Sequence, residues 1–189
     1  MSEVVVREVV RMYSVSFRDS RISQLISWYV ETLRRAVDII WSNIKWRYDF
    51  EKYRKDKRRK VKVPILPKDS KFRKYLRDTL MEENPYAAHW VDAVIRTAYS
   101  VMKSWRKRYV KGRARKVKPR IKRRFARCKI TLMKIDYKRK AIRITLKPYE
   151  YVEVSYANTW FIKRVEGWTV GEVVLKDDKV LIPFKRVET

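Results

Sequence analysis

The period of the apolar positions changes twice along the chain, and each change predicts a change of secondary structure. Residues 4–17 are rich in valine and alternate apolar with polar positions, which favours a β-strand with one buried face. Asp19 and Ser20 then offer side-chain oxygens that suit a helix N-cap. From Ile22 to Ile44 the apolar residues recur every three or four positions, so we expect a long amphipathic helix that ends near residues 49–53.

Two further helices are predicted in the middle of the chain. The segment 52–68 is basic and contains two prolines, so we expect a loop there. Asp69 or the serine after it can cap a short helix that runs to about residue 83. Asn84 and Pro85 suit the cap and first turn of a third helix, whose apolar positions repeat with helical period. Gly112 is a plausible end for that helix.

After Pro119 the period returns to two, which predicts strands. Residues 127–135 and 141–147 flank a polar turn at 136–140 and are typical of a β-hairpin. The other expected elements are strands at 151–156, 170–176 and 179–184 and a short helix at 158–164. The predicted class is therefore α+β, with a helical block inserted between an N-terminal strand and a C-terminal antiparallel sheet. We expect that sheet to close as a small barrel.

The composition indicates a folded, strongly basic chain. Among 189 residues there are 49 Lys or Arg and 21 Asp or Glu, a formal net charge of +28, while hydrophobic residues make up 46%. Disordered basic tails lack that apolar content, so we expect a buried core in one domain or two small ones. Few amides and thiols are present, a bias that thermophile proteins show. We take a thermophilic source as a hypothesis.

The sequence has few metal-ligating residues and only short apolar runs, which excludes several classes of protein. The single Cys128 rules out an internal disulfide and a Cys-rich zinc site, and a lone His89 leaves too few ligands for a histidine centre. We therefore expect no cofactor, and any metal chemistry would have to rest on carboxylates. The N-terminus does not resemble a signal peptide, and no apolar run approaches a membrane span. We expect a cytoplasmic protein with no membrane partner.

The positive charge is concentrated in two short windows. The segment 103–129, which we call the basic seam, carries fifteen Lys or Arg and no acidic residue. A second cluster at 52–62 carries eight. Clustering of this kind is the expected footprint of a polyphosphate binder, because uncompensated cations repel one another until counterions or phosphates lie beside them. The alternatives without a binding function are a solvated surface for the seam and a solubilising insertion for the second cluster.

Arginines are the strongest candidates for phosphate contacts, since the guanidinium fork matches phosphate geometry better than an ammonium group does. The seam candidates are Arg106, Arg108, Arg113, Arg115, Arg120, Arg123 and Arg124. Lys57, Arg58 and Arg59 of the second cluster would add non-specific support. Aromatic residues beside basic or strand segments could stack on bases. These are Tyr109, Phe125, Tyr149, Tyr151 and Trp160, although each alone is more often structural.

Other conspicuous residues are better explained by packing. Trp41, Trp90 and Trp105 lie on or beside apolar helical stripes and are expected in the core. His89 has no neighbouring nucleophile or metal ligand, which favours a packing or capping role. Asp38 and Asp92 could be catalytic carboxylates, but pairing with an arginine such as Arg34 or Arg96 is the stronger expectation.

Three stretches of the sequence resemble one known family. PYAAHWVDAVIRTAYSVMKSWRK, which begins at Pro85, and the basic stretch after it are similar to the N-terminal half of the TnpB family, also called OrfB. YVEVSYANTWFIKR, from Tyr151, and GEVVLKDDKVLIPFKR, from Gly171, follow in the same order. The family consists of RNA-guided nucleases of insertion sequences, and the resemblance looks like its crenarchaeal branch. It covers nearly the whole chain.

The resemblance implies a wedge-like β-barrel interrupted by a helical recognition lobe, with guide RNA and target DNA lying against both. Under this interpretation residues 1–20 and 117–189 form the barrel and residues 21–116 form the lobe. Family members continue into a RuvC-like nuclease domain with an acidic triad and a four-cysteine zinc ribbon. This chain stops at Thr189, where that domain would be expected to begin. No catalytic residue can be carried over, so we expect no enzymatic activity from these residues.

Two functional hypotheses follow, and an enzymatic one is kept as a third. The first is binding of structured, guide-type RNA and DNA by a transposase-associated protein of the TnpB type. The second is a stand-alone regulatory or interaction protein that competes with a full-length nuclease for the same nucleic acid. The third, a nuclease in its own right, would need magnesium-dependent cleavage that a carboxylate substitution abolishes. The sequence does not indicate an oligomeric state.

Overall fold

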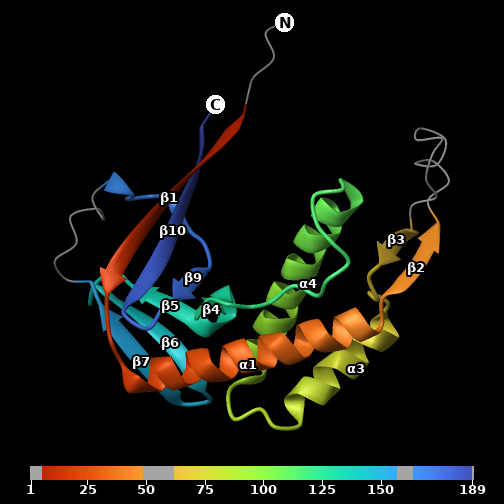
Figure 1. Ribbon diagram of the computed structural model, residues 1–189. Coiled ribbons are helices and arrows are strands. Elements are labelled where there is room, and N and C mark those ends of the chain that lie inside the picture. Colours follow the sequence, from red (N-terminus) through yellow and green to blue (C-terminus); the bar gives the residue numbers. More distant parts are fainter. Residues whose placement is uncertain (1–5, 49–61, 157–163, 189) are drawn as a thin grey trace, which may run out of the picture. The chain divides into compact units, whose positions relative to one another are not determined.

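A computed structural model describes residues 6–48, 62–156 and 164–188, and the chain forms two compact units (Figure 1). The first, which we call the sheet unit, comprises Met1–Val30, Pro85–Ala93 and Arg123–Thr189. The second, the helical unit, comprises Glu31–Asn84 and Val94–Lys122. Helices α1 (Ser20–Ser42) and α4 (Ala88–Val110) each contribute residues to both.

The first sheet of the sheet unit is antiparallel throughout and follows the order β1-β10-β9-β4, with β8 also paired to β10. Its strands are β1 (Arg7–Ser16), β4 (Ala126–Cys128), β8 (Thr169–Val170), β9 (Val173–Leu175) and β10 (Lys179–Glu188). Strands β1 and β10 pair along their whole length, from Arg7 opposite Glu188 to Ser16 opposite Lys179. The N-terminal strand is thus joined to the last strand of the chain.

The second sheet has the order β5-β6-β7 and is also antiparallel. It contains β5 (Met133–Asp136), β6 (Ala141–Lys147) and β7 (Glu150–Ser155), and the short 3-10 helix η1 (Ile130–Leu132) precedes it. Asp136 shapes the β5–β6 turn, because its Oδ1 accepts hydrogen bonds from the backbone N–H groups of Lys138 and Arg139, both at 3.0 Å. The predicted hairpin is therefore confirmed from Met133 onward.

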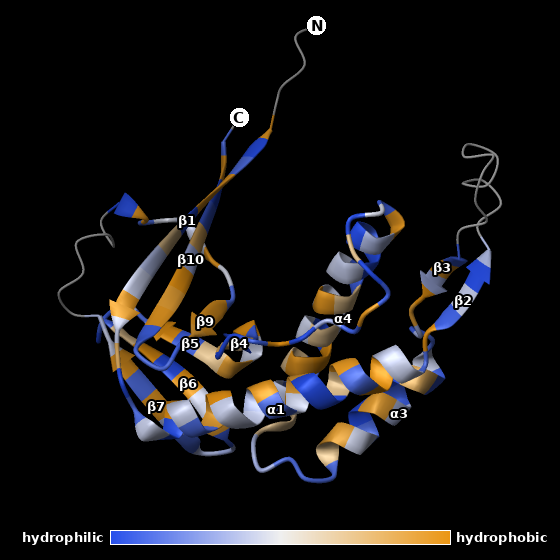
Figure 2. Cartoon of the chain, viewed as in Figure 1, coloured by the Kyte–Doolittle hydropathy of each residue, from blue (hydrophilic) through white to orange (hydrophobic). Residues whose placement is uncertain are grey.

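The core of the sheet unit is built from α1, the start of α4 and the inner faces of the strands. Ile22, Leu25, Ile26 and Tyr29 of α1 are fully buried. Figure 2 shows the alternating hydrophobic and hydrophilic stripes of α1 that make this burial possible. Trp90 is also fully buried, and its indole N–H donates to the carbonyl oxygen of Thr145 in β6 at 2.8 Å. That bond satisfies the one polar group of the largest buried side chain.

The helical unit contains the second half of α1, most of α4, helix α3 (Ser70–Met81) and a two-stranded sheet. The sheet pairs β2 (Lys45–Tyr48) with β3 (Lys62–Ile65). Its core consists of apolar side chains at helical spacing on all three helices. Among them are Leu33, Ala36, Val37, Ile40, Leu76, Leu80, Ala98 and Met102.

An aromatic cluster lies at one end of the helical unit. Trp41 and Trp46 both meet the ring of Trp105 edge-on, with centroids 5.0 and 6.2 Å apart. Tyr109 stacks on Trp105 at 5.3 Å and meets Trp46 at 5.4 Å. Since Trp46 lies in β2 and Trp105 and Tyr109 lie in α4, these rings join the small sheet to the helix.

The predicted end of the first helix was wrong. Helix α1 ends at Ser42, because the backbone and side chain of Asn43 both bond back to α1 carbonyls, those of Ile40 and Ile39. The chain then enters β2, which brings Trp46 to the aromatic cluster. The expected loop at 52–68 likewise contains β3, in which Pro64 pairs opposite Trp46. The packing of Trp46 in the aromatic cluster thus outweighs the helical spacing of apolar residues, which continues through Ile44 in the sequence.

Two strand predictions and one helix start also needed correction. The expected strand 127–135 is divided by η1 into β4 and β5, which belong to different sheets. The expected strand 170–176 is divided at Gly171, where an added Cβ would lie 3.0 Å from the ring of Pro183. Helix α4 begins at Ala88 rather than after Asn84. The predicted helix 158–164 lies almost wholly outside the described residues.

Other predictions are confirmed. Asp69 caps α3, with its Oδ1 accepting from the backbone N–H of Phe72 at 2.6 Å. Gly112, at φ +73°, ends α4 by donating its backbone N–H to Tyr109, while the Arg113 N–H donates to the Arg108 carbonyl. The α+β class with antiparallel sheets is confirmed as well. Strand pairing within the described residues closes none of the sheets into a ring.

Replacing the α3 cap tests this account of the helical unit. Asp69→Ala removes the acceptor for the Phe72 N–H, so the free energy of unfolding should fall by about 1 kcal/mol in a urea titration. Asp78→Ala, on the same helix, removes an exposed carboxylate that caps nothing, and should change it by less than about 0.5 kcal/mol. Equal losses in the two variants would contradict the capping role.

Candidate nucleic-acid interface

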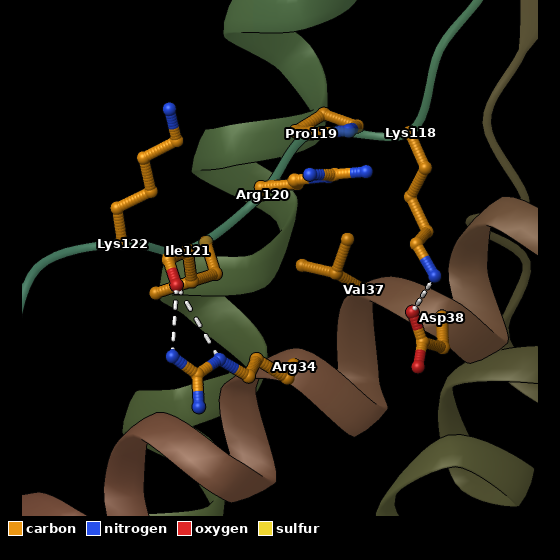
Figure 3. Close-up of a pocket in the computed structure, with 8 residues that line it drawn as sticks. All are labelled: Arg34, Val37, Asp38, Lys118, Pro119, Arg120, Ile121 and Lys122. Atoms are coloured by element: carbon orange, nitrogen blue, oxygen red, sulfur yellow. Dashed lines mark hydrogen bonds and ion pairs between the residues drawn. The ribbon is translucent and has the colours of Figure 1, made fainter.

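The basic seam includes the last turns of α4 and continues beyond the end of that helix, where it contacts α1 within the helical unit. Two nitrogens of Arg34, Nε and Nη2, donate to the Ile121 carbonyl oxygen at 3.3 and 3.1 Å, as Figure 3 shows. Lys118 forms an ion pair with Asp38 on the same helix. Closer to the α4 terminus, the indole N–H of Trp105 donates to the Arg115 carbonyl at 3.2 Å. Three points along the seam are therefore fixed without neutralising most of its charge.

A cavity of about 550 Å³ lies between this part of the seam and α1. Arg34, Val37 and Asp38 contribute from the helix, and residues 118–122 contribute from the seam. In Figure 3 the side chain of Arg120 lies above Val37, whereas the Lys122 ammonium group extends away from the helix. The seam therefore presents cations both along the cavity and outward to solvent.

Six of the seven arginines predicted to contact phosphate are exposed, and five of these six form no ion pair among the described residues. These five are Arg108, Arg113, Arg115, Arg120 and Arg123. Within the described residues, no carboxylate oxygen lies at ion-pair distance from their guanidinium groups. Their donors face solvent at the surface of a basic chain, which is the arrangement that a polyanion would satisfy.

The other two arginines are engaged by the protein itself. Arg106 is half-buried and donates its Nε–H to the Pro64 carbonyl at 2.8 Å. Arg124 forms a bidentate pair with Asp177, with Nε–Oδ2 and Nη2–Oδ1 distances of 2.9 and 3.0 Å. It also donates to the Ser27 hydroxyl and the Ser23 carbonyl of α1. Arg124 thereby ties the loop before β10 to α1 inside the sheet unit.

The pairing of Arg124 with Asp177 shifts the pKa values of both residues. The hydrogen bond from Arg124 lowers the pKa of Asp177 below its ordinary value, and the same bond raises the pKa of Arg124. Asp19 shows the same effect, since its side-chain hydrogen bond from Arg21 lowers its pKa. Asp19 and Asp177 are thus held ionised by arginines of their own unit.

The aromatic candidates divide between packing and exposure. Tyr109 stacks on Trp105, and Phe125 packs against Tyr29 with centroids 5.9 Å apart, so both rings are half-buried. Tyr149 is 94% exposed, at a positive φ of 65°, in the turn between β6 and β7. Trp160 and the candidates Lys57, Arg58 and Arg59 lie outside the described residues. The expected core positions of Trp90 and Trp105 are confirmed, while Trp41 is half-buried against Trp105.

Two cation–ring contacts were not anticipated from the sequence. The Lys116 ammonium group lies 4.3 Å from the centroid of Trp46, and the Arg143 guanidinium lies 3.4 Å from that of Tyr151. Arg143 and Tyr151 occupy outward positions on adjacent strands, so strand alternation was the signal available for that pair. The Lys116 contact depends on β2, which the sequence pattern did not predict.

Asp38, one of the two carboxylates singled out in the sequence, has another partner than expected. Asp38 pairs with Lys118, and Arg34 pairs with Glu31 at 3.0 Å, so the expected Asp38–Arg34 pairing was wrong. Asp92 lies 3.6 Å from Nδ1 of the half-exposed His89. In the part of the chain that the structure describes, no group of three or more His, Cys, Asp or Glu residues could hold a metal ion. Nor is any described helix long and apolar enough to cross a membrane.

Comparisons with known proteins identify relatives over most of the chain. A family model described as the uncharacterized protein MJ0013 family matches residues 25–145. Protein MJ0013 of Methanocaldococcus jannaschii is 40% identical over 149 residues, which is 75% of this chain and 91% of that protein. A TnpB-like protein of the same organism, MJ1635, is 36% identical over 183 residues, or 95% of this chain. The match spans only 41% of the length of MJ1635.

The Arg124–Asp177 pair predicts a pH-dependent stability difference. Because the pKa of Asp177 is lowered by folding, the pair stabilises above the unfolded value of about 3.9, and this contribution is lost as the pH falls through the lower folded value. Arg124→Ala should therefore cost about 1 kcal/mol of unfolding free energy at pH 7, and less below about pH 3.

Arg123→Ala is the matched control, since it removes one exposed positive charge that has no carboxylate partner among the described residues. Urea titrations at both pH values compare the two variants. A cost for Arg124→Ala that stays the same from pH 7 to pH 2.5 would contradict a contribution from the ionised Asp177.

Proposed function

The chain belongs to the MJ0013 family and is TnpB-like over 95% of its length, and on this basis we propose that it binds structured, guide-type RNA and DNA through the basic seam. Similarity to a TnpB-like protein also supports a transposon-associated origin. The observation that carries the proposal is the set of five exposed seam arginines with no carboxylate partner among the described residues.

The seam suits a polyanion better than a small anion because its cations extend along the chain. They run from the last turn of α4, through the Gly112 turn, to the segment beside α1. Backbone contacts hold this path at Arg115 and Ile121, so less conformational entropy would be lost when phosphates bind. Arg108, Arg113, Arg115, Arg120 and Arg123 are the proposed direct contacts.

The remaining candidates receive secondary roles in this proposal. Arg106 and Arg124 each keep N–H donors that their contacts with the protein do not use. These donors could contact phosphate while the protein contacts stay in place. Tyr109 and Phe125 would offer less ring surface to bases, because Tyr109 stacks on Trp105 and Phe125 packs against Tyr29. Lys57, Arg58 and Arg59 would add electrostatic attraction.

We assign two parts of the chain the roles that the TnpB resemblance implies. Residues 1–20 and 117–189 would act as the wedge-like barrel, and residues 21–116 would act as the recognition lobe. Guide RNA and target DNA would both lie against them. The role we propose is binding without cleavage, and magnesium-dependent cleavage lost on a carboxylate substitution would contradict it.

A second candidate function is a stand-alone regulator that competes with a full-length nuclease for RNA. The observation that favours it is MJ0013, a relative of which 91% is covered by the match and which therefore contains little beyond this region. If the chain acts in this way, it should displace a longer TnpB-like protein from a shared RNA in a competition assay. Binding of the RNA without displacement would favour the first function.

Neutralising three seam arginines should reduce both affinity and salt dependence for a labelled RNA hairpin. The change is Arg113→Gln, Arg120→Gln and Arg123→Gln together. Each lost phosphate contact should lower the slope of log K against log salt by about one unit, so the slope should fall by about three. Filter binding between 50 and 300 mM KCl, concentrations typical of such assays, measures it.

The matched control carries the same loss of charge away from the seam. Lys71→Gln, Lys74→Gln and Lys138→Gln remove three exposed cations from α3 and from the β5–β6 turn. This variant should retain nearly the original slope. If both variants lose affinity equally, net charge and not the seam governs binding; if the unaltered chain binds no RNA hairpin at low salt, the proposed function fails.

A further inference from the structure

A second, smaller cavity in the helical unit lies away from the segment 118–122. Its volume is about 340 Å³, and its walls come from β2, β3, the linker before α3, and α4. The α4 residues in it, Tyr99, Lys103 and Arg106, are spaced by four and three positions, so they lie on one face of the helix. The volume is at the lower end of the range for small-ligand pockets, roughly 300–1,000 Å³.

Among the described residues, four cations and no acidic residue line the cavity. The cations are Arg47, Lys68, Lys103 and Arg106. In the described part of the chain no carboxylate lies at ion-pair distance from any of them. A nearby carboxylate, Asp69, is engaged at the α3 cap, where it accepts from the Phe72 N–H. Convergent unpaired cations around one cavity predict an anionic occupant.

Polar contacts fix the cationic wall before any ligand binds. The Arg106 Nε–H bond to the Pro64 carbonyl, 2.8 Å long, orients the guanidinium and leaves its terminal nitrogens available. Tyr99 donates its hydroxyl to the Pro67 carbonyl at 2.5 Å, and burial raises the pKa of this tyrosine, so the donor stays protonated. Arg73 covers the Tyr99 ring at 4.6 Å and donates to the Lys68 carbonyl.

The rest of the lining is apolar, which narrows the chemistry of the ligand. Ile65, Leu66 and the Tyr99 side chain complete the wall. A bare phosphate ion would use the cations and leave this apolar surface in water. A phosphate that carries a flat, largely apolar ring would use both parts of the wall.

We propose that this cavity binds one nucleoside phosphate, with the phosphate against Arg47, Lys103 and Arg106 and the base against Ile65 and Leu66. The inference rests on the proposed nucleic-acid-binding function and adds a subsite to it. The nucleotide can belong to a bound strand or be a free mononucleotide, and both present the same chemistry to the cavity.

The test is calorimetric titration of the full chain with AMP at low salt. AMP should bind more tightly than inorganic phosphate. Lys103→Ala and Arg47→Ala should each weaken AMP binding by about tenfold, as expected for loss of one contact to a charged phosphate. Both side chains are exposed, so neither substitution is expected to unfold the protein.

Lys74→Ala is the matched control, because it removes one exposed charge from α3 outside the cavity. It should leave AMP affinity unchanged. The proposal is overturned if AMP does not bind, if AMP binds no better than phosphate, or if Lys74→Ala weakens binding as much as Lys103→Ala does.

Two further arms separate this inference from the proposed function and identify the source of the nucleotide. RNA-hairpin binding by the unaltered chain together with absent AMP binding would overturn the subsite alone, whereas loss of both would overturn the proposed function as well. Competition with a single-stranded oligonucleotide distinguishes the sources. Displacement of AMP identifies a nucleotide of a bound strand as the occupant, and retention of AMP identifies a free mononucleotide; either result supports the cavity as a nucleotide site.

Discussion

Repulsion among like charges is the constraint on which the helical unit depends. Its arginines and lysines far outnumber its carboxylates, so beside the Arg34–Glu31 and Lys118–Asp38 ion pairs the unit also has neutral contacts that leave the charge in place. Backbone carbonyls of Pro64 and Lys68 accept hydrogen bonds from Arg106 and Arg73. A carbonyl orients a guanidinium without cancelling its charge. The cations are thereby positioned while their field remains available to an anion.

The sheet unit handles its arginines differently. Arg124 is paired with Asp177 and Arg21 with Asp19, and in both pairs the carboxylate pKa is lowered. Those charges are neutralised locally and contribute mainly to structure. Within one run of basic residues, then, position in the fold decides whether an arginine holds the protein together or stays exposed without a carboxylate partner. Charge density along the sequence does not make that distinction.

The sequence predicted elements whose signal is local and missed those that depend on distant partners. The Asp69 cap, the Gly112 terminator and the apolar stripe of α1 are local features, and the structure confirms them. Strand β2 forms because Trp46 packs on Trp105, nearly sixty residues away. The internal role of Arg124 depends equally on Asp177. The periodicity of a short window carries no information about such a distant partner. This is why the sequence predicted a loop at 52–68 and treated all seven candidate arginines of the seam alike, as phosphate contacts.

The aromatic cluster explains how so basic a unit keeps its fold. Trp41, Trp46, Trp105 and Tyr109 meet at the point where the seam leaves α4, and Lys116 lies over the Trp46 ring. Ring faces attract a cation and bury apolar area at once, so they stabilise a site that carboxylates would neutralise. Repulsion nevertheless opposes the compact state. A bound polyanion would relieve this repulsion, so its binding would stabilise the helical unit through the same uncompensated charge.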